Sequence, residues 1–209
     1  MNRVMPDLWE TEVESPHPGL TTHAYLLVRG EGNVLFYNTG HRHEIERMAE
    51  LGGVARQFLS HRDELGGTIN DIREHYGAKL GGHVNEKDDF ARIRVPDILF
   101  ERRETLLGNV EVIPTPGHTP GSTCFLVHAE IGRKYLFTGD TLYLAADGTF
   151  RPGLLSFSNR EDLVASLELL ATLEPDVALS SAFGGDSGFK EVSGQWAEHV
   201  AAALEKLKE

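Results

Sequence analysis

Three short polar clusters contain the residue types best suited to chemistry in this chain, and each follows an apolar run. They lie at residues 60–67, 115–122 and 138–141. Together they supply imidazoles and carboxylates from His61, Asp63, Glu64, His118 and Asp140. Loops at strand ends hold side chains on a rigid scaffold while leaving them open to solvent. Because this mixture of donors suits a divalent ion such as zinc, iron or manganese, the clusters predict a metal site.

Each cluster also has an explanation that involves no chemistry. Asp63 and Glu64 precede an expected helix and could simply cap it. The prolines and glycines around His118 could mark only a tight loop, and Asp140 could close an Asx-turn. These alternatives stay open for each cluster alone, but three such clusters in one chain favour a common site.

The elements expected to position these clusters are short strands that alternate with helices, a pattern typical of mixed α/β layers. Runs at 24–28 and 34–37 flank a turn and predict a hairpin. Further strands are expected up to 59–60 and near 79–83, 109–114, 122–128, 134–138 and 177–179. Helices are expected near 43–51, 66–76 and 195–207, and a further one opens at Ser158, where the Ser158 hydroxyl and Glu161 predict a capping box.

Composition limits the classes of function. The 209 residues include nothing rich in Pro, Gly or Ser that would separate two halves, so we expect one domain over residues 1–209. A net charge of −12 disfavours nucleic acid as a partner. With no long apolar run and no signal-like segment, we expect a cytoplasmic protein without membrane contact. The oligomeric state stays open.

The single cysteine, Cys124, lies in an apolar run. A buried, unreactive thiol is the expected state there.

The order and wording of the three clusters resemble the metallo-β-lactamase superfamily, especially its glyoxalase II-like hydrolases. The run TPGHTPGS at 115–122 is the most specific piece, and TGD at 138–140 matches the aspartate motif of the family. The resemblance extends from about Tyr25 to the C-terminal helix. It implies an α/β fold of four layers, an αββα sandwich with the metal site at one edge.

The departures from the family pattern concern its histidines. The first family motif reads Thr-His-x-His-x-Asp-His-x-Gly-Gly. Aligned on the closing glycine pair, His61 matches the second histidine and Asp63 the aspartate. Leu59 and Glu64 replace the first and third histidines, and Phe183 stands where the family has a late histidine.

The remaining residues imply a reduced metal site. By resemblance, His61, His118 and Asp140 would hold one ion, while only Asp63, Glu64 and Asp140 remain for a second. An all-carboxylate second position would bind zinc weakly. We therefore expect one divalent ion, with zinc first and iron or manganese as alternatives, or two ions only if the second is a hard cation.

Two further histidines, His41 and His43, follow a strand whose end approaches the site in the family. Either is an alternative replacement for the ligand lost at Leu59, although a solvated helix start is the simpler interpretation.

The activity implied by the resemblance is hydrolysis of a small ester, thioester or lactone. A divalent ion lowers the pKa of its bound water from about 15.7 toward ~7, which provides a metal-bound hydroxide as nucleophile at neutral pH. Asp63 or Glu64 would orient this water or take its proton. A second hypothesis is a catalytically degenerate member that binds a small molecule or a partner, since three imidazoles are replaced. A di-iron redox site ranks last, because 209 residues leave no room for a flavin-binding domain.

Overall fold

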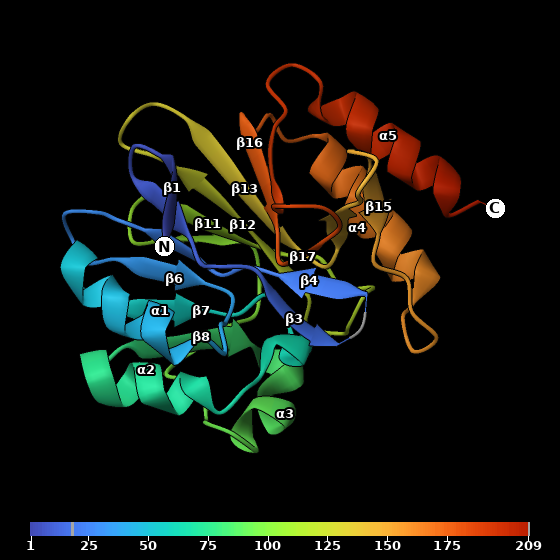
Figure 1. The fold of residues 1–209 in the computed structure, drawn as a ribbon. Coiled ribbons are helices and arrows are strands. Elements are labelled where there is room, and N and C mark those ends of the chain that lie inside the picture. Colours follow the sequence, from blue (N-terminus) through green and yellow to red (C-terminus); the bar gives the residue numbers. More distant parts are fainter. Residues whose placement is uncertain (18, 209) are drawn as a thin grey trace.

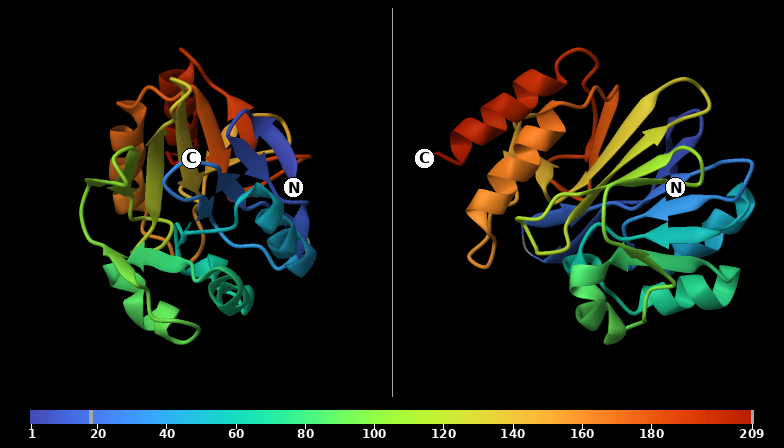
Figure 2. Two further views of the ribbon diagram at one scale, coloured as in Figure 1. Left: turned by 90° about the vertical axis from the view of Figure 1, so that its left-hand side faces the viewer. Right: turned by 180° about the vertical axis from the view of Figure 1, so that it is seen from behind.

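Helices and sheets form four layers in this computed structural model, which describes residues 1–17 and 19–208 (Figure 1). One sheet is covered by α1 (Arg42–Arg47), α2 (Thr68–Tyr76) and α3 (Lys87–Ala91). The other is covered by α4 (Arg160–Ala171) and α5 (Trp196–Lys206), as both views in Figure 2 show. This arrangement is the predicted αββα sandwich. None of the described helices is long and apolar enough to cross a membrane.

The first sheet has seven strands in the order β1-β2-β5-β6-β7-β8-β9. Their bounds are β1 (Asn2–Met5), β2 (Leu8–Glu10), β5 (Tyr25–Leu27), β6 (Val34–Phe36), β7 (Arg56–Phe58), β8 (Lys79–His83) and β9 (Ile98–Phe100). Strands β5 and β6 form the predicted antiparallel hairpin, and β6 to β9 run parallel. Since parallel strands end at one edge of a sheet, β7 delivers the 60–67 cluster to that edge.

The second sheet has six strands in the order β10-β11-β12-β13-β16-β18. Their bounds are β10 (Glu104–Leu106), β11 (Val110–Pro114), β12 (Thr123–His128), β13 (Lys134–Gly139), β16 (Val177–Ser180) and β18 (Phe189–Glu191). The 115–122 cluster is the loop that joins the antiparallel pair β11 and β12. Strand β13 ends at Gly139, so Asp140 follows directly at its carboxyl end.

A third sheet of five short strands has the order β15-β14-β17-β4-β3. Their bounds are β3 (Glu14–His17), β4 (Leu20–Thr22), β14 (Leu142–Leu144), β15 (Phe150–Pro152) and β17 (Ala182–Phe183). The sequence did not predict these strands, because segments of two to four residues are too short to show a period.

Aromatic side chains fill the space between the two large sheets. Phe36 stacks on Phe137 with ring centroids 3.8 Å apart, and Phe58 stacks on Phe125 at 5.7 Å.

Cys124 lies on β12 and is fully buried, and burial raises the pKa of its thiol to about 11. The prediction of a buried thiol is therefore confirmed.

The start of α4 differs from the sequence-based prediction. The N-cap is Asn159, whose Oδ1 accepts hydrogen bonds from the backbone N–H groups of Glu161 and Asp162 at 3.0 and 3.2 Å. The predicted capping box between Ser158 and Glu161 is wrong. The Ser158 hydroxyl donates instead to the carbonyl of His118 at 2.9 Å, which fixes the loop before α4 to the 115–122 loop.

Candidate metal centre

Four side chains from the three clusters converge at the edge where the two large sheets meet. The Nε2 atom of His61 lies 3.9 Å from Asp63 Oδ2 and 3.6 Å from Asp140 Oδ2. The Nε2 atom of His118 lies 3.5 Å from Asp63 Oδ2 and 3.8 Å from Asp140 Oδ2. Ligand atoms of His61, Asp63 and His118 all lie within 4.8 Å of one another, and Asp140 is the outlying member, outside this group of three.

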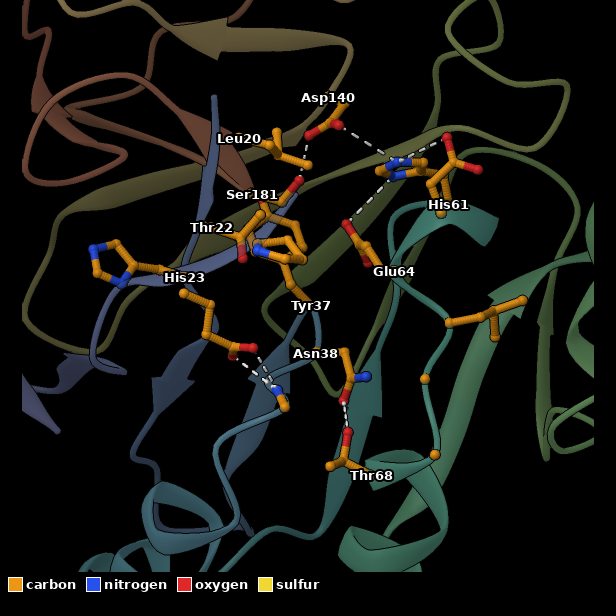
Figure 3. Close-up of a pocket in the computed structure, with 17 residues that line it drawn as sticks. Leu20, Thr22, His23, Tyr37, Asn38, His61, Glu64, Thr68, Asp140 and Ser181 are labelled. Carbon is orange, nitrogen blue, oxygen red and sulfur yellow. Dashed lines mark hydrogen bonds and ion pairs between the residues drawn. The ribbon is translucent and has the colours of Figure 1, made fainter. Parts of the chain in front are cut away.

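The ring of His61 is held by contacts at its other nitrogen. Nδ1 lies 2.8 Å from the Ser60 hydroxyl and 3.3 Å from Glu64 Oε1. Glu64 also accepts hydrogen bonds from the backbone N–H and the hydroxyl of Ser60. Figure 3 shows Asp140 and Glu64 at different edges of the His61 ring. Because these contacts fix Nδ1, Nε2 faces the centre of the cluster.

The ring of His118 is fixed in the same way by a backbone group. Its Nδ1 lies 2.7 Å from the carbonyl oxygen of Gly153, just after β15. The loop that carries His118 is tied to α4, since Asn159 N–H donates to the carbonyl of Gly117 at 2.8 Å and Ser166 donates to that of Pro116 at 2.7 Å. Hydrogen bonds to the segment after β15 and to α4 with its N-cap therefore fix the position of His118.

Asp140 is oriented by the segment that follows β16. Its Oδ1 accepts hydrogen bonds from the hydroxyl of Ser181 and the backbone N–H of Ala182, which leaves Oδ2 to face the two imidazoles. The turn before Asp140 lies close to the 60–67 cluster, because a Cβ on Gly139 would stand 2.3 Å from the hydroxyl oxygen of Ser60. Glycine is required here both for this approach and for its φ of +53°.

The burial of the two imidazoles defines the electrostatics of the site. His61 and His118 are each only 2% exposed, and neither Nε2 atom has a hydrogen-bond partner among the described residues. A buried polar atom left without a partner costs about 1–3 kcal/mol. Burial by itself lowers the pKa of His61, but the charges of Asp140 and Glu64 outweigh it and raise the pKa to about 10. The surroundings therefore favour a positive charge at this point.

The other predicted site residues do not direct a donor atom at the centre of the cluster. Glu64 is directed at Ser60 and at Nδ1 of His61, so its carboxylate does not join the four convergent groups. His41 Nε2 contacts the carbonyl of Val13, and His43 pairs with Glu12, so neither replaces the imidazole lost at Leu59.

Two residues that support the site carried no signal in the sequence. The contribution of Gly153 is its backbone carbonyl, and that of Ser181 is a single hydroxyl in the segment after β16.

Comparison with known proteins gives the family. The model of the metallo-beta-lactamase superfamily matches residues 37–181, a span that contains all four convergent side chains. The chain belongs to the metallo-beta-lactamase superfamily. Among solved structures, a metallo-beta-lactamase from Pontibacter korlensis superposes with a TM-score of 0.76 at 17% identity, covering 100% of this chain and 98% of that one. The likeness at this identity shows the metallo-beta-lactamase fold.

Curated relatives of this metallo-beta-lactamase fold protein share a common name. A hydroxyacylglutathione hydrolase of Anaeromyxobacter dehalogenans is 38% identical over 142 residues, which cover 65% of this chain and 51% of the relative. A hydroxyacylglutathione hydrolase of Albidiferax ferrireducens is 30% identical over 165 residues, which cover 77% and 61%. The chain thus spans about half to three fifths of the length of these relatives.

Proposed function

We propose that this protein is a metal-dependent hydrolase of a small ester, thioester or lactone, with one divalent cation held by His61, Asp63, His118 and Asp140. The observation that carries the proposal is the pair of buried Nε2 atoms, which have no hydrogen-bond partner within the described part of the chain and face two carboxylates. The names of the curated relatives, which are hydrolases of an acylated thiol, support this class of reaction.

The convergent atoms fit a cation in spacing and in chemistry. Donor atoms bound at 2.0–2.2 Å to a tetrahedral ion lie about 3.3–3.6 Å apart. The imidazole–carboxylate separations of 3.5–3.9 Å match these values or exceed them by a few tenths of an ångström. Asp140 lies outside the group of three ligand atoms within 4.8 Å of one another, so its carboxylate and that of Asp63 would have to approach each other for both to hold the same ion. A donor set of two imidazoles and two carboxylates suits zinc first, and iron or manganese as alternatives.

The proposed number of ions is one. A second position would need donors beyond Asp63 and Asp140, but the carboxylate of Glu64 is already engaged by Ser60 and by His61. Phe183 offers no donor where the family pattern has a histidine, and its ring is stacked on His23 at a centroid distance of 4.6 Å.

The bound cation, Asp63 and Glu64 have different roles in the proposed reaction. When bound, the cation would supply Lewis acidity toward a carbonyl oxygen and lower the pKa of water. Asp63 is 44% exposed, and contact with His118 lowers the pKa of its carboxyl group. We assign to Asp63 the transfer of a proton from the attacking water to the leaving group. Glu64 acts through His61, whose ring it orients, and is a positioning residue rather than a catalytic one.

Removal of metal tests this proposal directly. Protein purified without chelator is expected to hydrolyse p-nitrophenyl acetate and an acetyl thioester. Dialysis against a chelator is expected to abolish the activity, and zinc, iron(II) or manganese(II) to restore it. Full activity after verified removal of metal would overturn the proposal. A metal-loaded protein that hydrolyses neither substrate would favour the alternative of a non-catalytic binding protein.

A further inference from the structure

A cavity of about 820 Å³ opens directly beside the proposed metal position. Asp63, His118 and Asp140 are part of its lining. Large apolar or aromatic side chains form the walls, namely Leu20, Tyr143, Leu154, Leu155, Phe157 and Phe183. A volume of this size is in the range of small-molecule sites, which are about 300–1,000 Å³. A carbonyl carbon that reacts at the cluster carries two substituents. The cavity is the space beside the cluster that one of them could occupy.

The charged side chains that line the cavity are acidic and do not favour an anion. Among the described residues that line it, the acidic groups are Asp63 and Asp140, and there is no Lys or Arg. A second cavity on the other side of the cluster, lined in part by Glu14 and Glu64, also has no Lys or Arg in its described lining. An anionic substituent would therefore meet carboxylates, and no lysine or arginine of the described lining would pair with it.

The guanidinium of Arg62 lies beside the site but is already engaged. Its Nε pairs with Asp63 at 3.9 Å and its Nη1 with Asp89 at 3.4 Å, and its Cζ lies 5.7 Å from the centroid of the Phe157 ring. Arg62 does not line either cavity. Because two carboxylates already pair with it, Arg62 does not provide a free anion-binding group.

Two wall residues are unusually exposed for their type. Leu155 is 50% exposed and Phe157 is 53% exposed, and both lie on the segment between β15 and α4. The ring of Phe157 is 6.1 Å from that of His118, so this apolar surface adjoins the reacting groups. The segment is fixed rather than free, because Ser158 accepts a hydrogen bond from the N–H of Leu155 and donates one to the carbonyl of His118.

We infer that this cavity binds an uncharged, apolar acyl chain, so that the substrates are neutral esters, thioesters or lactones of medium-chain acids rather than glutathione thioesters. This inference rests on the proposed function for the reaction itself. The acyl chain would cover Leu155 and Phe157, and the carbonyl carbon would lie beside His118 and Asp140. Binding would gain from burial of apolar surface on both molecules.

A series of p-nitrophenyl esters from acetate to hexanoate tests the inference. Because each buried methylene contributes about 0.8 kcal/mol, kcat/KM is expected to rise about fourfold per methylene in the metal-loaded protein. Leu155→Ala and Phe157→Ala are expected to lower the slope with chain length. Leu99→Ala, which removes an exposed leucine of β9 outside the cavity, is the matched control and should keep the slope.

Charge is tested with one acyl group on two thiols. Hexanoyl N-acetylcysteamine is expected to react with a kcat/KM at least about tenfold above that of hexanoyl glutathione, since glutathione brings carboxylates to an acidic site. The opposite preference, or a flat chain-length series with active acetate hydrolysis, would overturn the inference and leave the proposed function intact.

A binding measurement keeps the inference testable without catalysis. Saturation-transfer NMR with 1-octanol is expected to show binding to the protein, weakened by Phe157→Ala and unchanged by Leu99→Ala. If no ester is hydrolysed but octanol binds in this way, the proposed function fails and the assignment of the cavity stands. Absence of binding, or binding insensitive to Phe157→Ala, contradicts the assignment.

Discussion

His118→Ala is expected to lower the affinity for a divalent metal by more than about 100-fold and to abolish ester hydrolysis. The loss of a group that merely supports a ligand already costs about 10–100-fold in affinity or activity, and His118 contributes the donor atom itself. The substitution removes one of the two buried Nε2 atoms that face the carboxylates. Metal affinity by competition with a chromophoric chelator, together with kcat/KM for p-nitrophenyl acetate, measures both effects.

The matched control is His128→Ala, which removes an exposed histidine on β12. It should leave metal affinity and activity as in the unmodified protein. If His118→Ala binds metal as tightly as His128→Ala and retains activity, His118 is not a ligand, and the proposed site is wrong. Free imidazole added to His118→Ala should restore part of the metal affinity, because the deleted ring leaves room for it.

Gly153→Ala is the second change with a large expected effect, although it adds a single methyl group. The new Cβ would stand 1.9 Å from the carbonyl oxygen of Asp140 and 3.0 Å from Nδ1 of His118. The backbone must shift to relieve this overlap, and the hydrogen bond that orients His118 shifts with it. We expect metal affinity to fall about 10–100-fold, and the free energy of unfolding to fall by about 1–3 kcal/mol.

Gly30→Ala serves as the control for this substitution, because a Cβ there meets nothing within 4 Å. Urea denaturation gives the change in stability, and metal titration at a temperature where both variants are folded gives the change in affinity. Wild-type affinity in a stably folded Gly153→Ala protein would show that the carbonyl of Gly153 does not position His118.

The parts of the fold that the sequence predicted are those with strong local patterns. The hairpin of β5 and β6, strand β8 and the pair β11 and β12 lie where alternation or continuous apolar runs placed them, within one or two residues. The convergence of His61, His118 and the two aspartates was expected from the resemblance of the three clusters to the family motifs, and the distances between these side chains agree with it.

The parts that escaped prediction depend on hydrogen bonds that sequence patterns do not show. Asn159 rather than Ser158 caps α4, since Ser158 is drawn away by the carbonyl of His118 in a different loop. Glu64 occupies an alignment position of a ligand, but the turn at residues 62–64 directs it toward Ser60. The sequence around Ser158 contains no information about His118, and alignment with the family motif does not show that Glu64 turns back to Ser60.

The cavity walls were unpredictable for the same reason. Leu20, Tyr143 and Phe183 come from three short strands of the third sheet, and they become neighbours only when β4, β14 and β17 pair. From the sequence, Phe183 was noted only because it stands where the family has a histidine. In the structure, Phe183 lines the cavity together with other apolar side chains.

The number of metal ions per chain tests the central claim most directly. Protein reconstituted with excess zinc and then dialysed against metal-free buffer should contain one equivalent by elemental analysis. The His61→Ala and His118→Ala proteins should each retain much less. Two tightly held equivalents in the unmodified protein would contradict a single site, and retention of one equivalent by both variants would contradict the assignment of these histidines as its ligands.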